Sequence, residues 1–219
     1  VQESVNEFYK SDRNLARAIN LAMQASEACL KAGDTQQAIT SLINGASICM
    51  VNKEPQKALE LSQRALELAV NVSDKLLLAR SYQNIGAAKK ILGKYDEALA
   101  SFYEAQKIYD TNSNTPMRDE LLCIKSIGST YYMKNDFAKA YENHILALNL
   151  LDITPDLSNN ELVRSELLVE VANDLAKLDG KDQAAKNYKE VLEILKGKEQ
   201  NPRALDLLER ASKGLKELN

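Results

Sequence analysis

The sequence is poor in the residues on which most enzyme chemistry depends. Among 219 residues there is no tryptophan and only one histidine, and aromatic residues make up 5%. A core must therefore rest on Leu, Ile and Ala, and a His-rich metal site is excluded. Eight glycines and four prolines are too few for the many turns of an all-β domain. Apolar runs such as Leu76–Ala79 fall far short of the ~18 residues that cross a membrane.

Charge and cysteine content limit the kinds of partner and the cellular compartments that the sequence favours. The chain carries 28 basic and 31 acidic residues, a net charge of −3, and no segment is strongly basic, which disfavours nucleic acid as a partner. Cys29, Cys49 and Cys123 are odd in number and widely spaced, so they do not form a disulfide framework. We interpret them as small buried apolar side chains. Cysteine usage slightly favours the cytoplasm over the periplasm and excludes neither.

An internal repeat organises the sequence. When copies are aligned on an alanine that follows a polar turn, successive anchors lie 40, 40, 42 and 44 residues apart. The columns around the anchor agree in type. The anchors are Ala18, Ala58, Ala98, Ala140 and Ala184; twelve residues earlier lie Ala46, Gly86, Gly128 and Ala172; five residues earlier, at the turn, lie Lys53, Gly93, Asn135 and Asp179.

Each copy predicts two antiparallel helices. Leu78, Tyr82 and Ile85 form an apolar stripe with helical spacing, and Gly93 ends that helix because glycine accepts the left-handed conformation. Gly86 lies in mid-helix, where we expect two helix backbones to approach closely against the alanines of the partner helix. The predicted helices span 12–32, 36–52, 55–70, 76–92, 95–109, 118–134, 137–151, 160–178, 181–196 and 202–217.

The copies resemble the tetratricopeptide repeat. The clearest reads ARSYQNIG at 79–86 and LGKYDEAL at 92–99, and the copy at 124–147 is nearly as close. The copies around Ala58 and Ala184 lack the aromatic residue at the turn, where Pro55 and Lys181 stand. The long period resembles the subclass that contains LGN-type spindle adaptors, kinesin light chains, bacterial Rap-type peptide receptors, and arrays preceding sensor kinases or diguanylate cyclases.

The resemblance implies an all-α, right-handed superhelical solenoid of antiparallel helix pairs. We expect one array over 1–219, with a partial first repeat at 1–34. Asn201 and Pro202 suit the N-cap and first position of a final capping helix, with Leu205, Leu208, Ala211 and Leu215 as its apolar stripe. The remaining elements are repeats at 35–73, 74–113, 116–155 and 158–199 and a capping helix at 201–219.

The resemblance also implies a function. In this family the first helix of each repeat lines a concave face that holds an extended or helical peptide. Asn amides there can hold a peptide backbone, and Arg and Lys favour an acidic segment. We also place Glu166 and Glu170 on this face, where they make its C-terminal end acidic. The predicted groove residues are Asn44, Arg80, Gln83, Asn84, Lys90, Lys125, Ser129, Tyr132 and Asn173.

No motif for catalysis, phosphate binding or metal ligation is present in the sequence. His144 falls in the column of Phe102 and Tyr188, which predicts a packed side chain between helices. Carboxylates are expected on exposed faces, without a pair in apolar surroundings. We therefore expect a non-enzymatic protein-binding module without cofactor or metal. Two alternatives stay open: a sensory segment of a larger signalling protein, and a self-assembling structural array or homo-oligomer.

Overall fold

The structure is a computed structural model that describes residues 15–154 and 160–218. Within these ranges it contains ten helices and no strand, which confirms the all-α prediction. Every predicted helix is present, and most ends agree within two residues; residues 12–14 of the first lie outside the described part. The helices are α2 (Leu15–Lys31), α3 (Thr35–Val51), α4 (Pro55–Ala69), α5 (Lys75–Ile91), α6 (Tyr95–Thr111), α7 (Met117–Met133), α8 (Phe137–Ile153), α10 (Glu161–Lys177), α11 (Lys181–Ile194) and α12 (Pro202–Glu217).

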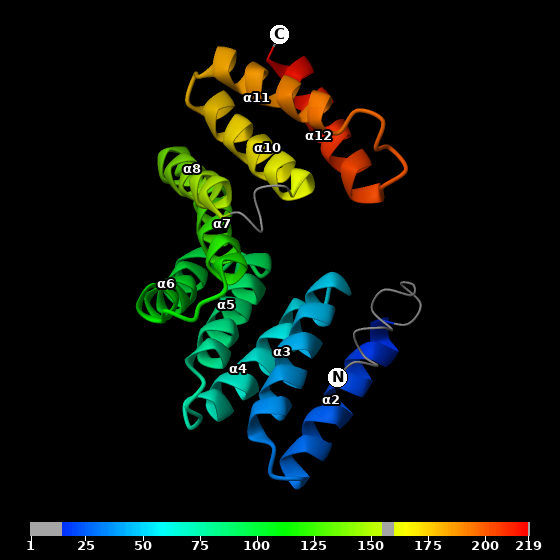
Figure 1. The fold of residues 1–219 in the computed structure, drawn as a ribbon, viewed down its shortest axis with the longest axis vertical. Helices are drawn as coiled ribbons and strands as arrows, with labels where there is room; N and C mark the ends of the chain where they lie inside the picture. Colours follow the sequence, from blue (N-terminus) through cyan, green and yellow to red (C-terminus); the bar gives the residue numbers. More distant parts are fainter. Residues whose placement is uncertain (1–14, 155–159, 219) are drawn as a thin grey trace. The chain divides into compact units, whose positions relative to one another are not determined.

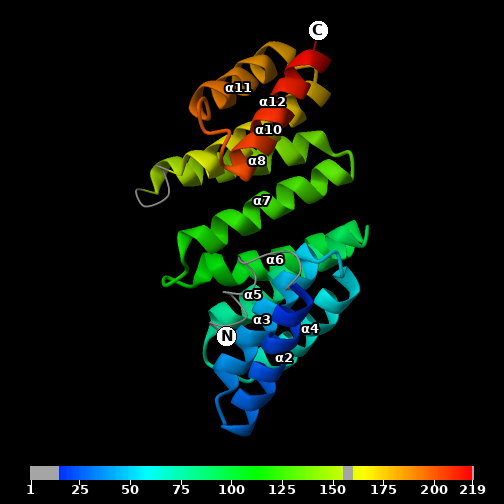
Figure 2. The ribbon, with the colours of Figure 1, turned by 90° about the vertical axis from the view of Figure 1, so that its right-hand side faces the viewer.

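The chain divides into two compact units between residues 115 and 116 (Figure 1). Unit 1 contains α2 to α6, and unit 2 contains α7 to α12. Inside each unit every helix packs against the next one along the chain, as expected for helical repeats (Figure 2). First helices of successive repeats also touch, α3 with α5 in unit 1 and α10 with both α7 and α12 in unit 2. Each unit therefore has a face built from first helices.

The turns between paired helices use one backbone conformation. Lys53, Gly93, Asn135 and Asp179 all have positive φ, at 59°, 76°, 61° and 60°. At Gly93 the amide donates to the carbonyl of Lys90 at 3.0 Å, so an end carbonyl of the helix is satisfied. The predicted role of Gly93 is confirmed. The three residues at the same repeat position, Lys53, Asn135 and Asp179, adopt the same left-handed conformation although they carry side chains.

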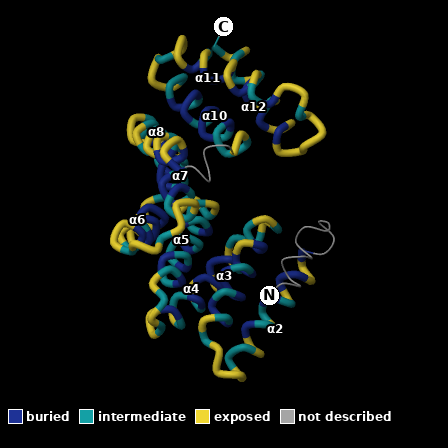
Figure 3. Tube along the Cα trace, viewed as in Figure 1, coloured by how far each residue is buried: buried dark blue, intermediate teal, exposed yellow. Residues whose placement is uncertain are grey.

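The repeat columns form the core. The anchors Ala18, Ala58, Ala98, Ala140 and Ala184 are all completely buried. Figure 3 shows buried stretches where helices face their neighbours and exposed stretches at many of the turns. Cys49 and Cys123 are buried free thiols, as predicted, whereas Cys29 is half-buried. Small residues let paired helices approach closely, and branched and aromatic side chains fill the remaining space.

The mid-helix glycines face rings, which corrects the expectation that they face alanines. A β-carbon on Gly86 would lie 2.8 Å from ring carbons of Phe102, and one on Gly128 would lie 2.6 Å from Cδ2 of His144. Distances below 3.0 Å do not occur for real β-carbons. Gly128 therefore makes room for a flat side chain from the paired helix.

Helix α12 ends unit 2 as a cover. Asn201 accepts hydrogen bonds from the amides of Arg203 and Ala204, at 2.9 and 3.3 Å, which confirms the predicted N-cap. Most of the predicted stripe packs on the core: Ala211 is buried, and Leu208 and Leu215 are partly buried against the core cluster. Leu205 is the exception, at 41% exposed, and Ala204 and Leu207 are buried in addition.

Candidate functional site

The predicted groove residues lie on the first helices of both units. Asn44 is on α3 and Arg80, Gln83, Asn84 and Lys90 are on α5, all in unit 1 and half-buried. Lys125, Ser129 and Tyr132 on α7 and Asn173 on α10 belong to unit 2, and they are also half-buried. The predicted residues are thus divided between the two units.

In unit 1 two of the expected ligand-binding amides are used inside the fold. The Asn84 side-chain nitrogen donates to the carbonyl of Ile43 at 3.0 Å and lies 3.4 Å from Oγ of Ser47, so it joins α5 to α3. The Gln83 carbonyl accepts a hydrogen bond from Oη of Tyr109 at 2.7 Å. Both amides stabilise packing between helices. The expectation that the Asn84 amide is held ready for a peptide is corrected in this respect.

Unit 2 contains a small cavity lined by cations. Its volume is about 200 Å³, and it lies among α7, α8, α10 and α12. Leucine and valine side chains form its apolar wall. The lining residues are Arg118, Leu121, Leu122, Lys125, Leu151, Asn160, Val163, Glu166 and Arg203.

One carboxylate lies between two of these cations. Nζ of Lys125 is 2.9 Å from Oε1 of Glu166, and the guanidinium of Arg203 binds the other carboxylate oxygen. The sequence prediction had separated Lys125 from an acidic end of the groove at Glu166, and the structure joins them. Burial alone would raise the pKa of Glu166, but Lys125 and Arg203 outweigh it and lower that pKa. Glu166 is therefore held as a carboxylate.

Two cavity residues were missed from the sequence. Arg118 precedes Lys125 by seven residues, which places both on one face of α7, and this spacing could have revealed it. Arg203 lies on the capping helix, outside the counted repeats. Counting Arg118, Lys125 and Arg203 against Glu166 gives the lining a formal charge of +2. Among the described residues no carboxylate forms an ion pair with Arg118.

A second cavity in unit 2, of about 210 Å³, is lined by two of the predicted residues, Tyr132 and Asn173. Tyr132 packs edge-to-face on Phe137 with centroids 5.3 Å apart, and Oδ1 of Asn173 accepts a hydrogen bond from Oη of Tyr188 at 2.6 Å. Ser129 donates to the carbonyl of Ser126 at 3.2 Å and does not line this cavity. Burial raises the pKa of Tyr132, and Asp174 and Glu217 add to the effect. The phenol therefore stays neutral over the physiological range.

His144 is buried, as predicted, but its surroundings differ from the prediction. Nδ1 lies 2.6 Å from Oδ2 of Asp174, and Nε2 lies 3.4 Å from Oε2 of Glu170. Asp174 is completely buried. The expectation that carboxylates lie only on exposed faces is therefore wrong. That expectation treated the carboxylates together and did not single out Asp174, which is buried on α10 beside His144.

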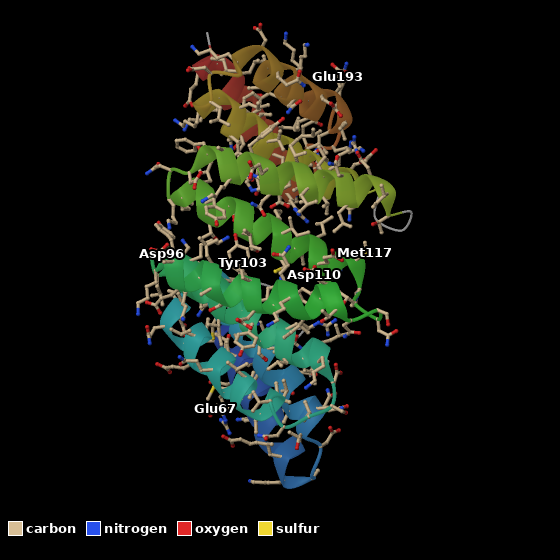
Figure 4. The ribbon with its side chains drawn as sticks, turned by 90° about the vertical axis from the view of Figure 1, so that its left-hand side faces the viewer. Glu67, Asp96, Tyr103, Asp110, Met117 and Glu193 are labelled. Atoms are coloured by element: carbon tan, nitrogen blue, oxygen red, sulfur yellow. The ribbon has the colours of Figure 1, made fainter. Side chains whose placement is uncertain are left out.

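The outer side of α6 contrasts with the cationic cavity. Asp96, Tyr103 and Asp110 are exposed and spaced by seven residues, so they form one stripe, and Figure 4 shows their side chains along this helix. Two carboxylates on this stripe disfavour an acidic ligand there.

Metal-binding clusters and membrane-spanning helices are absent from the described ranges. No group of three or more His, Cys, Asp or Glu residues in residues 15–154 and 160–218 is arranged to hold a metal ion. None of the described helices is long and apolar enough to traverse a bilayer.

Comparison with known proteins identifies the repeats. No curated protein matches the chain in sequence. Residues 37–111 match the family model described as tetratricopeptide repeat. Among solved structures, BtubC (BKLC) from P. vanneervenii has a TM-score of 0.70 at 16% identity, covering 93% of this chain and 89% of that chain.

Two other solved structures have the same fold. A Podosopora anserina protein with nearly identical TPR-like repeats, named for kinesin light chain, has a TM-score of 0.67 at 16% identity, covering 91% of this chain and 96% of that chain. A Rap protein complexed with competence and sporulation factor has a TM-score of 0.63 at 17% identity, covering 94% and 60%. Residues 37–111 of this chain thus match the tetratricopeptide repeat, and most of the chain has the fold of such helical-repeat proteins.

Proposed function

We propose that this chain is a protein-binding scaffold that docks an extended, acidic segment of a partner on its first-helix faces. The family and fold support the general role, because tetratricopeptide repeats serve as protein-interaction scaffolds. The Rap protein named above, which is similar in fold, is complexed with competence and sporulation factor. The acidic character of the segment is our inference from the charges of this chain.

The observation that carries the proposal is the cationic cavity of unit 2. A carboxylate from a partner would meet Arg118 first, because Glu166 already binds Lys125 and Arg203. A guanidinium can bind a carboxylate through two parallel hydrogen bonds. The apolar wall formed by Leu121, Leu122 and Val163 would accept the aliphatic part of the same segment.

Helix geometry adds to the attraction. Arg118, Asn160 and Arg203 lie at the N-terminal ends of α7, α10 and α12, where backbone amides carry partial positive charge. In unit 1, Arg80 and Lys90 on α5 are the corresponding cationic residues predicted from the sequence. Neither unit needs a cofactor for this role.

Fluorescence anisotropy with a labelled peptide of alternating Glu and Ala tests the proposal. We expect binding that weakens as salt rises, since charges are screened beyond about 8–10 Å at physiological ionic strength. Arg118→Glu should weaken binding about tenfold, which corresponds to ~1.4 kcal/mol. Arg80→Glu reports the contribution of unit 1.

Lys107→Glu on α6 is the matched control, because it makes the same charge change at an exposed residue that does not line the cavity. A Lys-Ala peptide of equal length controls for charge sign. If Lys107→Glu abolishes binding while Arg118→Glu and Arg80→Glu do not, the first-helix faces are not the site. Equal binding of the acidic and basic peptides would also contradict the proposal.

A further inference from the structure

His144 is buried between two helices of unit 2. Its side chain on α8 is about 2% exposed, and its ring lies against Gly128 of α7. In the preceding repeat, Phe102 occupies the same column and packs on Gly86. An apolar ring therefore satisfies this packing position, and the histidine is not required to fill space.

The ring of His144 lies beside two carboxylates of α10. Nδ1 is 2.6 Å from Oδ2 of Asp174 and makes a hydrogen bond with it. Nε2 is 3.4 Å from Oε2 of Glu170, one helical turn earlier on α10, but these two buried atoms make no hydrogen bond. A neutral imidazole has one N–H donor and can still serve Asp174, whereas an imidazolium ion also attracts both carboxylates by its charge. Loss of the charge would leave the two carboxylates side by side without a cation between α8 and α10 to offset them.

We propose that His144, Asp174 and Glu170 make the junction between α8 and α10 a protonation-sensitive contact. The junction is tightest when the ring is positively charged beside both carboxylates, and it loosens when the ring becomes neutral. The inference rests on the buried geometry of unit 2 and does not depend on the proposed peptide site.

Other titratable and charged groups lie around the cluster. Tyr132 of α7 and Tyr188 of α11 interact electrostatically with Asp174, and Glu217 and Arg210 of α12 act on Tyr188. Burial raises the pKa of Asp174 and so disfavours its carboxylate, and the hydrogen bond and charge of His144 oppose that rise. The positive ring is therefore the group that favours an ionised Asp174 at this junction.

The composition of the chain makes the test direct. His144 is the single histidine, so every imidazole signal in an NMR spectrum of the full chain belongs to it. We would titrate the ring nitrogens and the backbone amides between about pH 5.5 and 8.5, the range where histidine ordinarily changes charge. We expect amides of α8 and α10 to shift with the ring, and the urea midpoint of unfolding to fall over the same pH step.

Two variants and a control complete the experiment. Asp174→Asn keeps an acceptor for Nδ1–H and removes the charge, so the fall in the urea midpoint should shrink by at least about half. His144→Phe places a phenyl ring on Gly128, as Phe102 does on Gly86, and the urea midpoint should then no longer fall as pH rises. Asp152 is an exposed carboxylate near the end of α8, the helix that carries His144, and Asp152→Asn should leave the pH dependence of the urea midpoint unchanged.

Three results would overturn the proposal. A ring titration without coupled amide shifts in α8 and α10 would overturn the proposal. A midpoint that rises with pH, or the same pH dependence in Asp174→Asn as in the parent chain, would also overturn it. If His144→Phe fails to fold, Asp174→Asn still decides the question.

Discussion

Gly86 and Phe102 pack so closely that a β-carbon on Gly86 would lie 2.8 Å from the ring carbons Cδ1 and Cε1. Glycine in mid-helix costs about 1 kcal/mol relative to alanine, and here that cost is offset by a fully buried aromatic ring. The pair joins α5 to α6 in the repeat that best matches the family pattern.

This contact predicts an order of stability for two glycine variants. Gly86→Leu should destabilise the fold by about 1–3 kcal/mol or more, because the side chain would displace Phe102. Gly93→Ala should cost about 1 kcal/mol, since φ is +76° there and open space surrounds the position. Urea midpoints measured by circular dichroism give the order. A larger loss for Gly93→Ala would contradict the assignment of the packing column.

The turn conformation predicts a stabilising substitution. Lys53 has φ of +59°, a conformation that costs a residue with a β-carbon but not glycine. Lys53→Gly should therefore raise the free energy of unfolding by about 0.5–1 kcal/mol. Lys107→Gly, in the middle of α6, should lower it by about 1 kcal/mol. Thermal unfolding of both variants checks the prediction, and a loss of stability in Lys53→Gly would count against strain at this turn.

The ion cluster of unit 2 predicts an acid-sensitive contribution. The pKa of Glu166 lies below its usual value because Lys125 and Arg203 outweigh burial. Stability from this group is therefore present above the unfolded pKa and is lost as pH falls through the lower folded pKa. Glu166→Gln should reduce the loss of stability at acidic pH. It should also lower the free energy of unfolding at neutral pH by about 1 kcal/mol or more.

A matched exposed pair controls the Glu166 experiment. Glu190 is about half exposed and lies 3.7 Å from Arg164, so Glu190→Gln should change stability by less than ~1 kcal/mol. Unfolding midpoints from acidic to neutral pH distinguish the two variants. If the unfolding midpoint of Glu166→Gln falls at acidic pH as much as that of the parent chain, other carboxylates cause the loss of stability.

The cover formed by α12 predicts the effect of truncation. Gly214 packs directly against the ring of Tyr188, and α12 also shields Val191 and Leu195 in the same core cluster. Removal of every residue after Gly197 should expose this surface and cause association or aggregation. Light scattering against concentration measures it. A monomer that is soluble and as stable as the full chain would show that α12 is not needed as a cover.

Local patterns in the sequence were sufficient for the helices and the turns. Apolar spacing, the alanine columns and the turn residue before each anchor depend on contacts within one helix pair, so a single repeat carries the information. The N-cap at Asn201 was equally local. The repeat family followed from the same columns, and residues 37–111 match its model.

Contacts between repeats required the tertiary structure. The sequence put Asn84, Lys125, Glu166 and Asp174 on the groove or on exposed faces, but the fold joins them to Ile43, to one another and to His144. Partners 30 to 41 residues apart leave no periodic signal, and a one-position error in helix phase turns a side chain by about 100°. Helix identity is thus set by local spacing, whereas the pairing of charges is set by how successive repeats pack.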